Sequence, residues 1–203
     1  MQSIKSIVTK RFGVIFALLS FVVILAVTLG FRQISIENAK DKSIAMAEII
    51  KAGLTAHMKS GIMDKRDYFL NEIKSTYNVN SINIIRSEAV NKQFGSSSLE
   101  KNIDEYSRYV FETKEPFFNL NEDQNKVSLQ SYIPYIASNQ NTLKCLECHN
   151  VSEGTVLGVV EIDIDLSQYK ALSLTYIVAI ILFLIFFIIR SEEHTSELQS
   201  PNT

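Results

Sequence analysis

Both cysteines of the chain lie in one pentapeptide, Cys145-Leu146-Glu147-Cys148-His149, which also contains one of the three histidines. Two thiols at this spacing can each add to a vinyl group of a porphyrin, and the adjacent imidazole can then bind the iron as its proximal ligand. The motif therefore predicts one covalently attached haem c per chain. Cys145, Cys148 and His149 would hold the cofactor, and His149 would bind its iron.

The same three side chains have two other uses. A structural zinc site needs a fourth ligand and usually a second pair of ligands elsewhere, and the sequence contains no second pair. A disulfide between Cys145 and Cys148 can form outside the cytoplasm, but so short a loop stabilises little and leaves His149 without a role. Haem is the favoured interpretation, and both alternatives stay open at this stage.

The sequence gives weaker evidence for the residues that would make the other contacts of a haem: the sixth iron ligand, the apolar wall and the partners of the propionates. Met58 lies on the apolar stripe of a predicted helix, where its thioether can serve as the sixth iron ligand or simply pack in the core. An open sixth position, filled by water or a diatomic gas, would suit a gas sensor. Tyr132 belongs to an apolar segment that can wall the cofactor, and Arg86 and Lys92 are candidate partners for the propionates.

Two apolar segments, residues 12–31 and 171–189, contain no charged residue. Each matches the roughly 20 residues that a helix needs to cross about 30 Å of hydrocarbon. Lys5, Lys10 and Arg11 precede the first segment, so the positive-inside rule places residues 1–11 in the cytoplasm. A cleavable signal peptide is the alternative, but its apolar core would be shorter.

We therefore expect two transmembrane helices in a bacterial inner membrane, in contact with lipid. Residues 32–170 would form one periplasmic domain between them. The periplasm is an oxidising compartment outside the cytoplasm, where haem is attached to such thiols, so the predicted topology and the cysteine motif support each other.

The end of the chain has a different character. Residues 190–200, RSEEHTSELQS, resemble the translation of a widely used sequencing-library adapter. This polar stretch has neither the period of an amphipathic helix nor a basic cluster. We therefore expect residues 190–203 to be a non-native tail on a truncated gene, and we assign no function to Arg190 or His194.

Helical periodicity dominates the start of the predicted external domain. Apolar or small residues recur every three or four positions in residues 36–58, which predicts an amphipathic helix that continues from the first membrane segment. Gly61 is expected to end this helix, and Asp64 is expected to cap a second one. The inner face of the second helix is predicted to carry Tyr68, Phe69 and Ile73.

Strand patterns follow, interrupted by one more helix. Strands are predicted at residues 81–86, 117–120, 127–136 and 155–166, and a helix at residues 102–114. In the last strand, Glu161, Asp163 and Asp165 are expected to face outward. Helices and strands without βαβ alternation predict an α+β fold with an antiparallel sheet, as in the PAS and Cache sensor folds, flanked by the two transmembrane helices.

The composition excludes some classes of function. With a net charge of −2, the chain has no basic field to attract nucleic acid. We also find no Ser-His-Asp set, no phosphate-binding glycine loop and no paired carboxylates with a reason to be perturbed, so the visible chain is not expected to be an enzyme.

Three segments carry a family resemblance: residues 84–95 (IIRSEAVNKQFG), residues 132–134 (YIP) and residues 144–159 (KCLECHNVSEGTVLGV). They resemble the periplasmic c-type haem sensor domains of the Tll0287-like (DUF3365) group, which stand at the front of bacterial chemoreceptors, diguanylate cyclases and histidine kinases. The resemblance covers most of residues 36–166. It implies a PAS-like haem fold, His149 as the proximal ligand and Met58 as a candidate distal ligand. It also implies a homodimer in which the N-terminal helix can be exchanged, so that Met58 reaches the partner's iron.

Three functions follow as expectations. The first is a truncated transmembrane receptor that senses redox state or a diatomic gas through its haem and has lost its cytoplasmic output module. The second is a membrane-anchored electron-transfer cytochrome with a redox partner. The third is a haem-free Cache domain that binds a small molecule and whose thiols are incidental.

Overall fold

The computed structural model describes residues 4–77, 79–96, 101–123, 126–139 and 144–197. The chain divides into two compact units, one formed by Ile36–Ser167 and the other by the segments before and after it. We describe each unit by itself.

The terminal unit consists of helical segments. Helix α1 (Ile4–Lys59) contains the first predicted apolar segment and α5 (Ser167–Glu197) contains the second. Both helices are long and apolar enough to cross a membrane, with mean hydropathy of 2.8 and 2.1 in their most apolar windows. Helix α5 continues into the polar segment expected to be a non-native tail, and residues 198–203 lie outside the described residues.

The Ile36–Ser167 unit contains a four-stranded antiparallel sheet in the order β1-β4-β3-β2. Its strands are β1 (Ser81–Arg86), β2 (Phe117–Glu122), β3 (Val127–Ile136) and β4 (Val156–Asp165). The predicted α+β class with an antiparallel sheet is confirmed, and the four predicted strands agree with the observed bounds to within about two residues.

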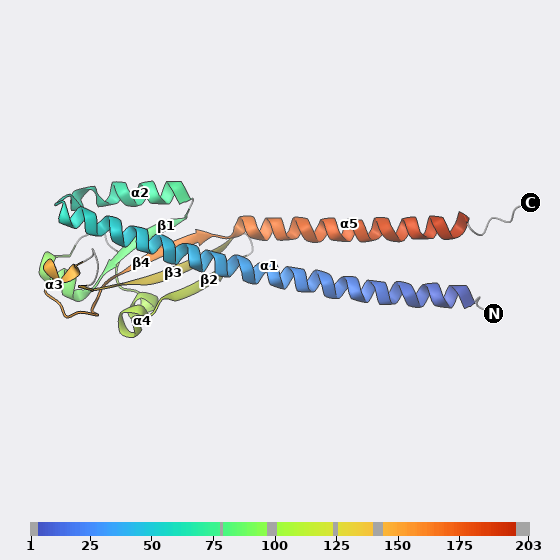
Figure 1. The fold of residues 1–203 in the computed structure, drawn as a ribbon, viewed down its shortest axis with the longest axis horizontal. Coiled ribbons are helices and arrows are strands. Elements are labelled where there is room, and N and C mark those ends of the chain that lie inside the picture. The colour runs from blue at the N-terminus through green and yellow to red at the C-terminus, as the bar shows by residue number, and fades with distance from the viewer. Residues whose placement is uncertain (1–3, 78, 97–100, 124–125, 140–143, 198–203) are drawn as a thin grey trace, which may run out of the picture. The chain divides into compact units, whose positions relative to one another are not determined.

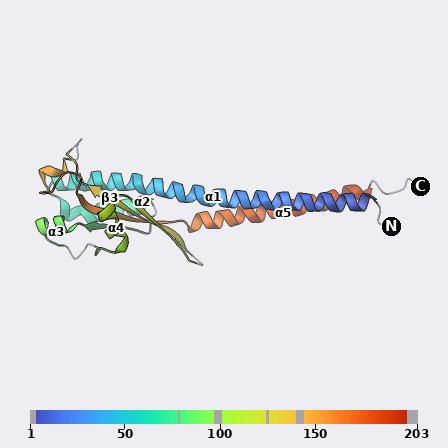
Figure 2. The same cartoon turned by 90° about the horizontal axis from the view of Figure 1, so that it is seen from below.

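Helices cover both faces of this sheet (Figures 1 and 2). The last turns of α1 lie on one face together with α2 (Arg66–Tyr77), and α4 (Glu105–Thr113) lies on the other. A short helix, α3 (Glu88–Phe94), follows β1 and was not predicted. Asp104 caps α4 by accepting a hydrogen bond from the Ser107 amide, and the Ser107 hydroxyl completes the capping box.

The start of α2 differs from the prediction. Gly61 has a φ of +67°, which glycine adopts readily, and α1 ends just before it at Lys59. A 3₁₀ turn over Met63–Lys65 then leads into α2, so Asp64 lies inside the turn and caps no helix. In α2, Ile73 is buried and Phe69 is partly buried, as predicted, but Tyr68 is 71% exposed instead of facing inward, and Leu70 is buried.

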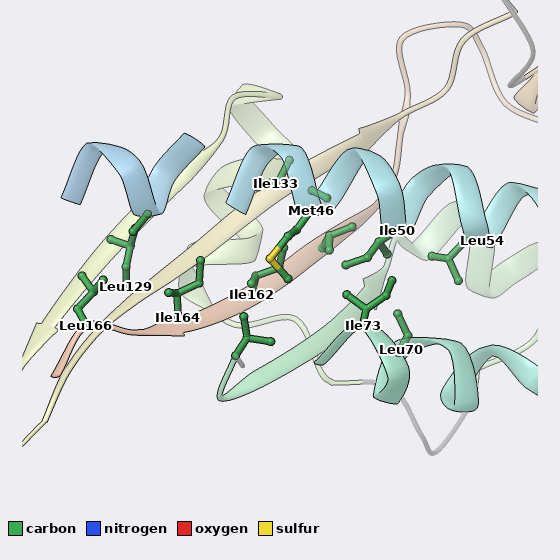
Figure 3. Close-up of a cluster of buried hydrophobic side chains, with 14 residues drawn as sticks. Met46, Ile50, Leu54, Leu70, Ile73, Leu129, Ile133, Ile162, Ile164 and Leu166 are labelled. Carbon is green, nitrogen blue, oxygen red and sulfur yellow. The ribbon is translucent and has the colours of Figure 1, made fainter. Parts of the chain in front are cut away.

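The main core fills the space between α1, α2 and the sheet (Figure 3). Ile50 and Leu54 of α1 point toward the sheet, and Ile73 of α2 points toward Ile50. Most of the stripe predicted for residues 36–58 is confirmed: Ala39, Ser43, Ala47, Ile50 and Leu54 are buried, and Ile36 and Met58 are half-buried. Met46 is also buried and was not among the predicted members.

The opposite face of the sheet contains a buried polar cluster beneath α4. Glu161 of β4 is 2% exposed, so its predicted outward, solvated position is wrong. Its carboxylate accepts hydrogen bonds from Lys101 at 2.7 Å and from Asn83 at 3.0 Å, and the Tyr132 hydroxyl lies 3.3 Å away. β4 is a central strand with helices on both faces, so Glu161 is buried, whereas Asp163 and Asp165 near the end of the strand are half-buried.

Candidate functional site

The predicted haem-attachment motif lies in the connection between β3 and β4. Hydrogen bonds from the Ala137 amide to the Thr155 carbonyl (2.7 Å) and from the Gly154 amide to the Ala137 carbonyl (2.8 Å) close the base of this connection. Gly154 has a φ of +80°, which favours glycine there. The Cys145 amide also donates to the Ser138 carbonyl at 2.9 Å, so the start of the motif is tied to the end of β3.

The motif itself forms one tight turn. Residues Cys145–Glu147 form a 3₁₀ turn, and the amides of Cys148 and His149 both donate to the Cys145 carbonyl, at 3.2 and 3.0 Å. Both thiols are free, with Cys145 buried and Cys148 exposed. The turn brings both thiols and the imidazole to the lining of one small cleft, which also includes Met58.

His149 is buried, with 8% of its surface exposed. Burial lowers the pKa of its imidazole, and the nearby Arg86 guanidinium lowers it further. The ring is therefore neutral near pH 7 and keeps a lone pair for a metal. Its Nδ1 is buried and has no hydrogen-bond partner among the described residues.

A second, larger cleft shares Met58, Tyr135 and His149 with the first. The space between its atoms amounts to about 460 Å³, and this figure includes open solvent. Its walls are mainly apolar, and they also include Arg66, Arg86 and a second methionine. The additional lining residues are Leu54, Met63, Ile84, Val90, Leu157 and Gly158.

The fold thus brings five of the predicted site residues to these clefts. Cys145, Cys148, His149 and Met58 line the smaller one, and Arg86 lines the larger one with Met58 and His149. Met58 belongs to the last turns of α1, far from the cysteine motif in the sequence, and packs against the cluster that contains Cys145.

Two predicted contacts lie elsewhere. Tyr132 is 1% exposed in the cluster beneath α4, because successive residues of β3 point to opposite faces of the sheet and Tyr135, not Tyr132, faces α1. Burial and the carboxylates of Glu161 and Asp104 raise the pKa of Tyr132. The Lys92 side chain is 81% exposed and pairs only loosely with Glu88, at 3.8 Å.

The structure also adds residues that the sequence reasoning did not select. Arg66 is only 8% exposed, yet nothing in its local sequence distinguishes it from a surface arginine. The Tyr135 hydroxyl hydrogen-bonds the Thr55 hydroxyl and lies 3.4 Å from the Lys51 carbonyl of α1. Tyr135 lies in the same predicted apolar segment as Tyr132. The two residues are three positions apart in one strand, so alternation places their side chains on opposite faces of the sheet, and this could have distinguished them.

These residues fit a covalent haem better than zinc or a disulfide. Both thiols are free, the imidazole is neutral, and arginines stand beside an apolar cleft. Within the described ranges, no group of three or more His, Cys, Asp or Glu side chains could hold a metal ion alone. A haem iron takes its equatorial ligands from the porphyrin, so it does not need such a group.

No family model matches the sequence, and no curated protein matches it either. The interpretation of the site therefore depends on its own residues and their geometry.

The burial of His149 predicts a pH dependence for the haem-free protein. Because its folded pKa is below the unfolded value of 6.5, the unfolded chain binds more protons as the pH falls, and the free energy of unfolding decreases below about pH 6.5. Denaturant midpoints at about pH 7.5 and about pH 5.5 measure this change. The His149→Gln variant should lose part of it; an unaltered pH dependence in that variant would contradict the prediction. The pKa values of Asp104 and Asp165 are lowered, mainly by hydrogen bonds from Ser107 and Ser167, so these carboxylates stay ionised over this pH range.

Proposed function

We propose that Ile36–Ser167 is a periplasmic sensor domain of PAS or Cache type that binds one haem c, within a membrane-anchored signalling receptor. The observation that carries this proposal is the convergence of two free thiols, a buried neutral imidazole and Met58 on one cleft. The two apolar helices support the membrane anchor.

Attachment requires only the two thiols. Each S–H adds across a vinyl double bond, so that sulfur bonds to one carbon and the hydrogen goes to the other, with no external oxidant. Cys148 is exposed, while Cys145 is buried against Tyr135, Val90 and Leu157. Cys145 would therefore hold the cofactor from the protein interior and Cys148 from the surface.

The remaining residues have separate roles in this proposal. The group supplies a redox-active iron with an axial position that can bind a protein side chain or a small ligand. His149 holds the proximal side, and Met58 is the candidate for the distal side. Arg66 and Arg86 can pair with propionate carboxylates, because a guanidinium in a partly buried cleft forms strong charge-assisted hydrogen bonds.

The chain also offers a route for a signal. Met58 belongs to α1, and this helix is continuous back to Ile4. A change of redox state or the binding of a diatomic gas would alter whether the Met58 thioether is held, and would bias the position of the end of α1. A difference of about 1 to 3 kcal/mol between the two states is enough for allosteric coupling. Homodimerisation with exchange of α1 would bring the partner's methionine to the same position.

Absorption spectra test the assignment of Met58. In protein matured in cells that attach haem c, Met58→Ala should lower the low-spin fraction of the ferrous or ferric haem, since a thioether ligand is lost. Met63→Ala is the matched control, because Met63 lines only the larger cleft. Identical spectra for the wild type and Met58→Ala would remove Met58 from the iron, and an effect confined to Met63→Ala would assign the second methionine.

Comparison of the two oxidation states separates a sensor from an electron carrier. Loss of the axial ligand or gas binding on reduction supports the sensor. Fast reversible reduction without any change in ligation supports a membrane-anchored cytochrome that exchanges electrons with a redox partner.

A further inference from the structure

The end of helix α3 touches the haem-attachment motif on both sides of His149. The Gln93 side-chain Nε2 donates to the Cys148 carbonyl at 2.9 Å, and the Asn150 amide donates to Gln93 Oε1 at 3.0 Å. A carbonyl can only accept and an amide N–H can only donate, so these partners determine which way the Gln93 carboxamide points. One planar group thus holds the peptide before His149 and the peptide after it.

Helix α3 provides a fixed base for this contact. Ser87 caps it by accepting a hydrogen bond from the Val90 amide, and the Ser87 amide donates to the Leu157 carbonyl of β4 at 3.0 Å. Val90 is 6% exposed and packs in the cluster that contains Cys145. The Arg86 guanidinium also donates to the Gly95 carbonyl at 3.3 Å, just after the helix ends. Helix α3, and with it Gln93, is therefore tied to β4 as well as to the loop that contains the cysteine motif.

Among the described residues, the Nδ1 atom of His149 has no hydrogen bond that would orient the ring. A metal-binding histidine usually donates its second ring nitrogen to a carbonyl or carboxylate, which fixes the ring. Here Nδ1 is buried without a partner among the described residues. The other contact is aromatic: the Phe94 ring stands edge-on to the imidazole, with centroids 5.3 Å apart and an interplanar angle of 80°.

We propose that Gln93 is a positioning residue that orients the His149 imidazole by clamping its two flanking peptide groups, in place of the missing bond at Nδ1. Phe94, the next residue of α3, limits rotation of the ring. This inference depends on the proposed haem site for its purpose, but the clamp itself exists in the haem-free protein and can be measured there.

The first experiment uses haem-free full-length protein in detergent. Hydrogen exchange at the Asn150 amide should be about fivefold faster in Gln93→Leu than in the wild type, because its acceptor is lost. NMR side-chain couplings of His149 should change from one rotamer to an average of several. Gln93→Glu keeps the acceptor and should retain slow Asn150 exchange. Lys92→Gln, on the same helix but exposed and away from the loop, should change neither reading.

The second experiment uses haem-loaded protein. The ferric low-spin EPR signal, which depends on the plane of the axial imidazole, should broaden in Gln93→Leu and stay as in the wild type for Lys92→Gln. Gln93 is exposed, so its replacement is not expected to unfold the domain, and circular dichroism checks this. Unchanged Asn150 exchange and unchanged His149 couplings would overturn the inference. A wild type without covalent haem would instead overturn the proposed function and leave the exchange test valid.

Discussion

Replacement of both Cys145 and Cys148 by alanine is expected to abolish covalent haem binding. The chain contains no other cysteine, so no thioether can form in the double variant. After maturation in cells that attach haem c, intact mass under denaturing conditions should show the wild-type polypeptide plus one haem, and the double variant should show polypeptide alone. A haem stain on a denaturing gel gives an independent reading of the same bond.

The two single variants sharpen this test. Each retains one thiol, so each should carry haem through one thioether with an altered absorption spectrum. Cys145 is 6% exposed and packs beside Tyr135, so its removal should disturb the site more than removal of the exposed Cys148. If the wild type has the mass of bare polypeptide after maturation, the haem proposal fails, and a haem-free domain becomes the better interpretation.

Lys101→Met is expected to destabilise the Ile36–Ser167 unit by about 2 kcal/mol, less than the cost of breaking a fully buried ion pair, because the Lys101 side chain is 37% exposed. The Glu161 side chain is only 3% exposed, and Lys101 Nζ lies 2.7 Å from its carboxylate. Without Lys101 this buried carboxylate keeps hydrogen bonds from neutral donors but loses its counter-charge. Urea unfolding followed by circular dichroism at neutral pH measures the change in the free energy of unfolding.

Two further variants provide the comparison. Lys92→Met removes an exposed lysine whose partner Glu88 is 3.8 Å away, and should cost less than about 0.5 kcal/mol. Adding Glu161→Gln to Lys101→Met should restore more than about 1 kcal/mol, because it removes the uncompensated charge while keeping an acceptor for Asn83. If Lys101→Met is as stable as Lys92→Met, the ion pair between Lys101 and Glu161 does not stabilise the fold as expected.

Local sequence patterns predicted the positions of helices and strands well, but they predicted the burial of individual side chains less well. The alternation in residues 81–86 matches β1, and the stripe in residues 36–58 matches the buried side of α1. Glu161 was placed in solvent because alternation in one strand does not reveal whether a helix covers the second face. Tyr68 was placed in the core together with Ile73, but five residues in an α-helix correspond to about 140°, so Tyr68 faces away from the core when Ile73 faces inward.

By itself, the sequence determined the cysteine motif, the two apolar segments and the order of most helices and strands, because these depend on neighbouring residues and on short periodicities. Only the tertiary structure decided which side chains meet. It brought Met58, Arg66 and Arg86 to His149, assigned Tyr135 and not Tyr132 to that face of the sheet, and placed Gln93 across the histidine. The physical reason is that these contacts join segments distant in sequence, whose side-chain directions depend on strand pairing and helix packing.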